Sequence, residues 1–184
     1  MNLKNAKLLG GIGAILMFGV LFRKFGTFLT IAGVILTLIA LKDLADKFKR
    51  SEIFSNYLIA FILHIVISIL FIVGSIASLF ALGLTLLFSF RLGVHLGAGF
   101  IILLVVLYAL YVVSGYFVKK SFDEVSDATK VTHFRTAGLL LFIGAVLLIV
   151  FGLGALVALI GYVFEIVAFF SLPDSISLPQ ENSV

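Results

Sequence analysis

The length of the apolar runs limits how this chain can fold more than any other feature. Three runs, residues 53–90, 92–118 and 136–172, contain 38, 27 and 37 residues, and Glu165 is the only charged residue within them. A helix needs about 20 apolar residues to cross a hydrocarbon core of about 30 Å. Each run can therefore cross a membrane at least once, and we expect an integral membrane protein.

The composition excludes an ordinary soluble fold. Hydrophobic residues make up 62% of the 184 residues and charged residues 12%, whereas soluble domains contain about 45–50% and about 25%. The chain has no cysteine, which excludes disulfide bonds and thiolate metal sites. Its net charge of +4 does not indicate a nucleic-acid partner, because the basic residues flank the apolar runs. There they orient and anchor membrane helices.

The first 22 residues resemble a secretory signal peptide, because a basic start precedes an apolar stretch. Arg23 and Lys24 follow this stretch in place of a small-residue cleavage site, and a similar phrase recurs at residue 139. We therefore expect a retained first helix.

We predict an all-α transmembrane bundle of about six spans, arranged as three hairpins over residues 3–46, 53–118 and 134–172. Arg23 and Lys24 divide the first hairpin, and the sequence FGLG divides the last. The middle hairpin has two readings. It forms two long helices with a connection near 82–97, or three helices if Gly74 and Ser75 form a turn.

The basic residues favour the six-span reading. With six spans, ten basic residues share the side of both termini and only Arg23, Lys24 and Arg91 lie on the other side. With seven spans, the basic clusters would be scattered over both sides. Since cytoplasmic loops are enriched in lysine and arginine, we predict a cell-membrane protein with cytoplasmic N- and C-termini. The ten basic residues are Lys4, Lys7, Lys42, Lys47, Lys49, Arg50, Lys119, Lys120, Lys130 and Arg135.

Residues 1–172 are expected to form one transmembrane domain, with cytoplasmic loops at 42–52 and 119–135 and a disordered tail at 173–184. The loops are charged but contain Leu44, Phe48, Phe122 and Val125 at helical spacing. These four side chains could lie on the membrane surface or on each other.

Two phrases near the chain ends are alike. LLGGIGAIL at 8–16 and LLLFIGAVL at 139–147 agree at six of nine positions. With a shift of three residues at the turn, Gly26 then aligns with Gly154 and Gly33 with Gly161. The first and last hairpins are therefore predicted to be repeats. They are parallel repeats, because two spans separate them, and this disfavours an inverted-repeat transporter.

Small residues four positions apart indicate close helix packing, because lipid offers no hydrophobic drive for association. We expect packing inside the chain, with homo-oligomer formation as the alternative. The pairs predicted to pack are Gly10 with Ala14, Gly74 with Ser78, and Gly154 with Ala158.

Four segments, AKLLGGIGAIL, LIALKDLADKF, FRTAGLLLFIGAVL and EIVAFFSLP, together resemble an archaeal family of multi-pass membrane proteins known only as a domain of unknown function. The resemblance extends over the chain up to Pro173 and is loosest between residues 68 and 107. It implies an archaeal cell-membrane protein and carries over no catalytic or binding residue.

Glu165 lies inside a predicted span, where an acidic residue costs about 2.5–3.5 kcal/mol. It should face other helices and be protonated, hydrogen-bonded or paired. Tyr111 lies at similar depth and could donate to it, with His64 as a more distant neighbour. Together they are candidates for a proton or cation site. The alternative is a structural hydrogen bond that fixes the last hairpin.

The sequence contains no phosphate-binding glycine loop, paired aspartates or nucleophile motif, so we predict no enzyme, no cofactor and no metal. Two functions remain. The first is a non-enzymatic membrane scaffold or accessory protein that acts on a protein partner of unspecified kind in the lipid bilayer. The second is a small transporter or channel component that uses Glu165. Sparse polar groups within the spans favour the first.

Overall fold

A computed structural model describes residues 2–21, 25–88, 90–150 and 152–175, without the side chains of residues 20–21, 84–88 and 90–97. The described residues form six α-helices and one short 3-10 helix, which confirms the predicted all-α bundle. The elements are α1 (Lys4–Met17), η1 (Phe18–Leu21), α2 (Gly26–Phe48), α3 (Ser51–Phe88), α4 (Phe90–Thr129), α5 (His133–Leu147) and α6 (Leu153–Phe170).

The chain packs as two compact units. Unit 1 contains residues 1–58 and 115–184, and unit 2 contains residues 59–114. Unit 1 therefore holds the two outer hairpins, α1–α2 and α5–α6, with the start of α3 and the end of α4. Unit 2 holds the rest of α3 and α4.

Among the described residues, four helices are long and apolar enough to cross a membrane. They are α2, α6 and the segments Ser51–Gly83 of α3 and Ala98–Thr129 of α4. Helix α5, with 15 residues, is apolar but shorter, and α1 has 14 residues before it tightens into η1. These helices give the chain the character of a membrane protein, as predicted from its composition.

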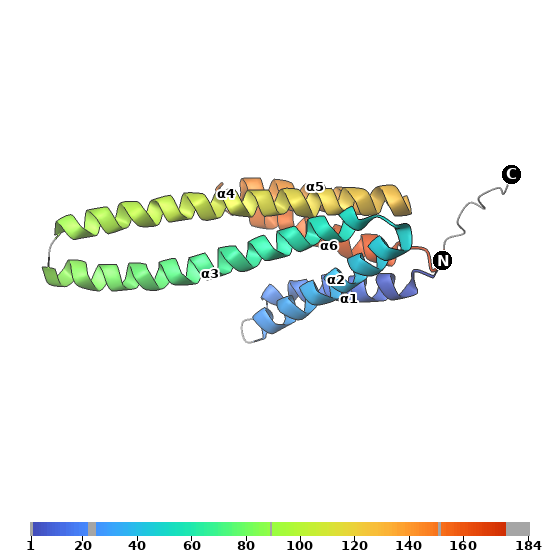
Figure 1. Ribbon diagram of the computed structural model, residues 1–184, viewed down its shortest axis with the longest axis horizontal. Helices are drawn as coiled ribbons and strands as arrows, with labels where there is room; N and C mark the ends of the chain where they lie inside the picture. The colour runs from blue at the N-terminus through green and yellow to red at the C-terminus, as the bar shows by residue number, and fades with distance from the viewer. Residues whose placement is uncertain (1, 22–24, 89, 151, 176–184) are drawn as a thin grey trace. The chain divides into compact units, whose positions relative to one another are not determined.

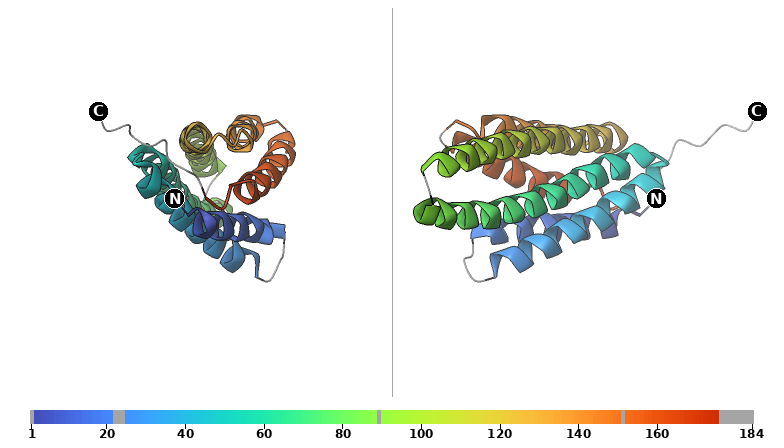
Figure 2. Two further views of the ribbon diagram at one scale, coloured as in Figure 1. Left: turned by 90° about the vertical axis from the view of Figure 1, so that its right-hand side faces the viewer. Right: turned by 60° about the vertical axis from the view of Figure 1, so that its left-hand side comes forward.

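In unit 1, α2 packs on α1, α1 packs on α6, and α6 packs on α5. The left view of Figure 2 shows these helices end-on, with red α6 between orange α5 and dark-blue α1. The first helix of one hairpin thus contacts the second helix of the other.

Each outer hairpin closes on a glycine crossing. A Cβ atom added to Gly13 would lie 2.8 Å from the carbonyl oxygen of Gly33 and 2.7 Å from Thr37 Oγ1. Such contacts are too close for any side chain, so glycine is what permits α1 and α2 to approach.

The second crossing has the same geometry. A Cβ atom added to Gly144 would lie 2.8 Å from the carbonyl oxygen of Gly154 and 2.9 Å from the Cβ atom of Ala158. In both hairpins a glycine of the first helix meets a glycine of the second, and also the residue four positions further on. The contacts therefore match Gly13 with Gly144 and Gly33 with Gly154.

This match agrees with the sequence alignment in the first helix and differs from it in the second. The sequence paired Gly33 with Gly161, whereas the crossing pairs Gly33 with Gly154, seven residues or two turns earlier. The last hairpin turns sooner, in a bend where Gly152 has a φ of +79°. The parts of its helices between the crossing and the turn are therefore shorter than in the first hairpin. A sequence alignment does not reveal this difference, because the chain is rich in glycine.

An aromatic cluster forms the core at the charged end of unit 1. Ring centroids lie 6.0 Å apart between Tyr57 and Phe122, 5.8 Å between Phe122 and Phe134, and 5.0 Å between Phe134 and Phe169. All four side chains are buried. The ring of Phe169 occupies the space beside Gly10, so the cluster connects α3, α4, α5 and α6 to α1.

Most of the two segments predicted as cytoplasmic loops is helical. Helix α2 continues to Phe48 and α4 continues to Thr129. Lysine and aspartate side chains four residues apart form ion pairs along these ends, and such pairs stabilise a helix. Leu44, Phe122 and Val125 are buried in the core of unit 1. These three side chains therefore pack in the protein core and do not lie on the membrane surface.

The chain ends of unit 1 also meet. The Leu3 N–H donates to the carbonyl oxygen of Asp174 at 2.9 Å, and Lys7 forms an ion pair with the Asp174 side chain at 3.0 Å. Asn2 and Ser175 form an isolated antiparallel bridge. Residues 173–175, predicted as the start of a disordered tail, are therefore paired with the N-terminal segment. Residues 176–184 lie outside the described residues.

In unit 2, α3 and α4 run side by side (Figure 1, green). Helix α3 passes through Gly74 and Ser75 without a break, so the two-helix reading of 53–118 is confirmed. A Cβ atom on Gly74 would overlap the side chain of Leu103.

The described residues of the predicted connection near 82–97 are helical, since α3 extends to Phe88 and α4 begins at Phe90. The segment between residues 82 and 97 contains glycine but no proline. In an apolar setting the backbone remains helical, because its polar groups must be satisfied within the chain.

Candidate functional site

Glu165 is almost completely buried in unit 1, with 1% of its surface exposed. Helix α6 directs it inward on the same face as Gly161, Ala168 and Phe169, which are also buried. The Oε1 atom has no hydrogen-bond partner among the described residues. A buried polar atom without a partner costs about 1–3 kcal/mol, so this carboxyl group is a feature that the fold must accommodate.

The polar neighbour of Glu165 in unit 1 is a tyrosine that the sequence analysis missed. The hydroxyl group of Tyr57, at the start of α3, lies within electrostatic range of the Glu165 carboxyl group and of Tyr162. The Tyr57 ring is stacked on Phe122. Tyr57 precedes His64 by two helical turns, and the sequence alone does not indicate that Tyr57 is the one near Glu165.

The glycine crossings identify the position that corresponds to Glu165 in the first hairpin. Glu165 follows Gly154 by eleven residues, and Leu44 follows Gly33 by eleven residues. Leu44 is fully buried. The same place in the two hairpins therefore holds an apolar side chain in one and a carboxyl group in the other.

His64 and Tyr111, the other two predicted site residues, lie together in unit 2. Their ring centroids are 5.5 Å apart in an edge-on arrangement. Glu165 belongs to unit 1, so donation from Tyr111 to Glu165 stays a prediction.

His64 has a second neighbour, Ser114, that the sequence analysis did not single out. His64 Nδ1 lies 2.9 Å from the carbonyl oxygen of Ala60 and 2.8 Å from Ser114 Oγ. Ser114 Oγ in turn donates to the same carbonyl oxygen at 3.1 Å. The arrangement fixes the imidazole ring and connects α3 to α4.

The six predicted packing residues lie in three places. Gly10 and Ala14 are buried in α1, with Gly10 against the ring of Phe169. Gly74 faces Leu103, and Ser78 Oγ donates to the carbonyl oxygen of Gly74 at 2.7 Å. Gly154 and Ala158 form the crossing with Gly144. Within the described residues, no three histidine, cysteine, aspartate or glutamate side chains are grouped as a metal site would require.

A family model described as protein of unknown function (DUF996) matches residues 29–163, which is most of the chain. This chain belongs to the DUF996 family. The DUF996 region begins in α2 and ends in α6, so it includes Leu44 and Tyr57 and stops just before Glu165.

The chain is similar to another protein over almost its whole length. It is 43% identical over 189 residues to Uncharacterized protein MJ1644 of the archaeon Methanocaldococcus jannaschii, covering 99% of this chain and 98% of that protein. The predicted resemblance to an archaeal family of unknown function is confirmed. No solved structure matches the chain.

Proposed function

We propose that this protein is a multi-pass protein of an archaeal cell membrane and acts as a non-enzymatic scaffold or accessory protein. Four long apolar helices and the similarity to a protein of Methanocaldococcus jannaschii support this proposal. Helix α1 with η1, and helix α5, would complete six crossings. The two are short, but a membrane can thin locally around short helices at a modest cost.

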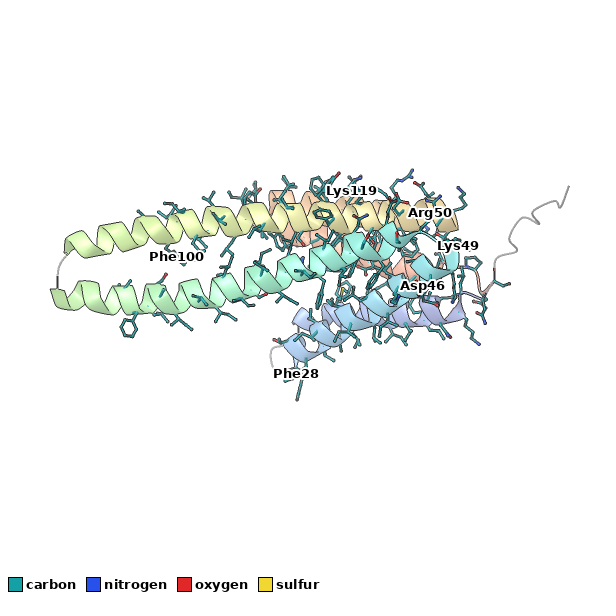
Figure 3. The ribbon with its side chains drawn as sticks, in the orientation of Figure 1. Phe28, Asp46, Lys49, Arg50, Phe100 and Lys119 are labelled. Atoms are coloured by element: carbon teal, nitrogen blue, oxygen red, sulfur yellow. The ribbon has the colours of Figure 1, made fainter. Side chains whose placement is uncertain are left out.

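The ordered charged end of unit 1 is the observation that carries the scaffold function. This charged cap consists of residues 42–57 and 119–135. Arg50 forms an ion pair with Glu124 at 3.0 Å, and Arg135 with Asp127 at 2.6 Å. Figure 3 shows Asp46, Lys49 and Arg50 where α2 passes into α3. A surface held rigid before binding saves the entropy of ordering it, which favours partner recognition.

We place the charged cap and both termini in the cytoplasm. Ten basic residues on that side support this orientation. The pairing of Leu3 with Asp174 supports it too, since it brings the two ends of unit 1 together. Arg23 and Lys24, which we assign to the opposite side, lie outside the described residues.

We also infer that the two outer hairpins arose by duplication of one hairpin. The equivalent crossings at Gly13 and Gly144 support this origin. The two hairpins would enter the membrane from the same side and would be parallel repeats, not inverted ones.

Photo-cross-linking in intact cells tests the scaffold function. A Lys49→p-benzoylphenylalanine variant carries the cross-linker in the charged cap. A Phe28→p-benzoylphenylalanine variant carries it on the apolar surface of α2, at a residue that is 76% exposed. We expect a discrete cross-linked protein from position 49 and none from position 28. Equal patterns from both positions would contradict a partner site in the cap.

The buried carboxyl group favours a second candidate function, a small transporter or channel component in which Glu165 binds a proton or cation. Ionisable residues within membrane helices commonly mark ion pathways. Glu165 fits this pattern because it is buried and its Oε1 atom lacks a partner in the described residues.

A Glu165→Gln variant tests this second function in reconstituted vesicles. The amide keeps the size of the side chain and cannot release a proton near neutral pH. Loss of proton- or cation-dependent flux, with the fold intact, would support transport. Unchanged flux would leave the scaffold function as the better account.

A further inference from the structure

We infer that Glu165 is a proton-binding site whose carboxyl group the fold does not need. The inference rests on the second candidate function and narrows its ligand from a proton or cation to a proton. It is carried by the contacts of Glu165 in unit 1 and by the comparison of the two hairpins.

The comparison with Leu44 indicates that folding of the hairpin does not require a carboxyl group at the position of Glu165. Leu44 occupies the equivalent position after the first glycine crossing and is fully buried. The hairpin therefore closes with an apolar side chain at this place. A carboxyl group here adds a desolvation cost, and its Oε1 atom recovers no hydrogen bond from the described residues. Packing alone therefore does not account for a carboxyl group at this position.

The surroundings of Glu165 do not suit an ionised carboxylate. A buried carboxylate requires a cation nearby or several hydrogen bonds. None of the ion pairs among the described residues includes Glu165. Gly161 and Phe169, one turn before and after it on the buried face of α6, offer no charge. The carboxyl group is therefore neutral and carries its proton.

The same surroundings do not suit a metal cation. Hard cations take about six oxygen ligands in proteins. Tyr57 from α3 lies within electrostatic range of Glu165, and Tyr162 from α6 lies within electrostatic range of Tyr57; both are phenols. Ser121, another buried hydroxyl of unit 1, already donates to the carbonyl oxygen of Ile53 at 2.6 Å. One carboxyl group and two phenols are too few for a cation cage, whereas a proton needs only the carboxyl group.

Infrared spectroscopy of the full protein in lipid nanodiscs tests the protonation. A protonated carboxyl group has a carbonyl stretching band that an ionised carboxylate lacks. We expect this band at neutral pH in the wild type and not in Glu165→Gln. It should be unchanged when sodium chloride replaces choline chloride at equal ionic strength. Absence of the band, or its loss in sodium, would overturn the inference.

Thermal unfolding tests the claim that the fold does not need the carboxyl group. We expect Glu165→Leu to raise the Tm by a few degrees, because it places in α6 the apolar side chain that Leu44 has at the equivalent position of the first hairpin. The matched control, Leu44→Gln, should lower the Tm. A Glu165→Leu variant that unfolds below the wild type would overturn the inference, since the carboxyl group would then be structural.

These outcomes are separate from the test of transport. The infrared band and the gain in Tm can be observed even if Glu165→Gln leaves flux unchanged, in which case the proton site stands and transport fails. Loss of flux without an infrared band in the wild type would instead support transport of a cation through Glu165.

Discussion

Gly144 and Gly154 meet backbone to backbone, and a Cβ atom on Gly144 would lie 2.8 Å from the carbonyl oxygen of Gly154. In the reverse direction, a Cβ atom on Gly154 would overlap the carbonyl oxygen of Gly144. Neither obstacle is a flexible side chain. The last hairpin can therefore close only with glycine at both positions.

A Gly154→Ala variant should accordingly separate α5 from α6. Overpacking of this kind typically costs about 1–3 kcal/mol, so we expect a lower unfolding temperature in detergent. Gly99→Ala is the matched control, because nothing lies within 4 Å of a Cβ atom at Gly99. Equal stability of the two variants would contradict the crossing.

The aromatic cluster should be the most sensitive part of unit 1. Phe134 lies between Phe122 and Phe169 and is fully buried. Phe134→Ala removes both ring contacts and leaves a cavity, which typically costs about 3–5 kcal/mol. Chemical denaturation in detergent measures the loss. Phe28→Ala, on a side chain that is 76% exposed, should change the free energy of unfolding little.

The sequence predicts the helical class and the hairpin order well, because the length of the apolar runs limits the class and the basic residues choose between the two readings of the middle hairpin. Runs of 38, 27 and 37 apolar residues leave few alternatives in a membrane. The middle hairpin is predicted to consist of two long helices, and α3 and α4 are two such helices. Helix ends are predicted less well, because the predicted cytoplasmic loops begin at residues 42 and 119, whereas α2 extends to Phe48 and α4 to Thr129. Lysine–aspartate pairs such as Lys42 with Asp46 extend the helices instead.

The surroundings of Glu165 are beyond the sequence for a different reason. The depth of a residue along its helix can be counted, and this placed Glu165, Tyr111 and His64 inside spans. Which helices face each other depends on packing, which put Tyr57 beside Glu165 and Ser114 beside His64. The correspondence of Leu44 with Glu165 likewise requires the glycine crossing, because the sequence alignment pairs Gly33 with Gly161 whereas the crossing pairs Gly33 with Gly154.

Lys49 terminates α2 in a left-handed conformation, with a φ of 54°. This conformation costs a residue with a side chain about 1–2 kcal/mol, and glycine usually occupies it. We expect Lys49→Gly to raise the free energy of unfolding by about 1 kcal/mol. Lys47→Gly, two residues earlier inside the helix, should lower it by a similar amount. Destabilisation by both variants in thermal unfolding would show that the Lys49 side chain itself stabilises the cap.

The Arg50–Glu124 ion pair connects the residue before α3 to the last part of α4, and both side chains are partly exposed. Exposed pairs contribute about 0.2–1 kcal/mol, and their attraction is screened by salt. A double-mutant cycle with Arg50→Gln and Glu124→Gln should therefore give a small coupling energy at low salt that disappears at high salt. The same cycle with Lys49→Gln in place of Arg50→Gln should give no coupling, because no ion pair joins Lys49 to Glu124 in the described residues. Coupling that persists at high salt would mean that Arg50 stabilises the cap by packing and not by charge.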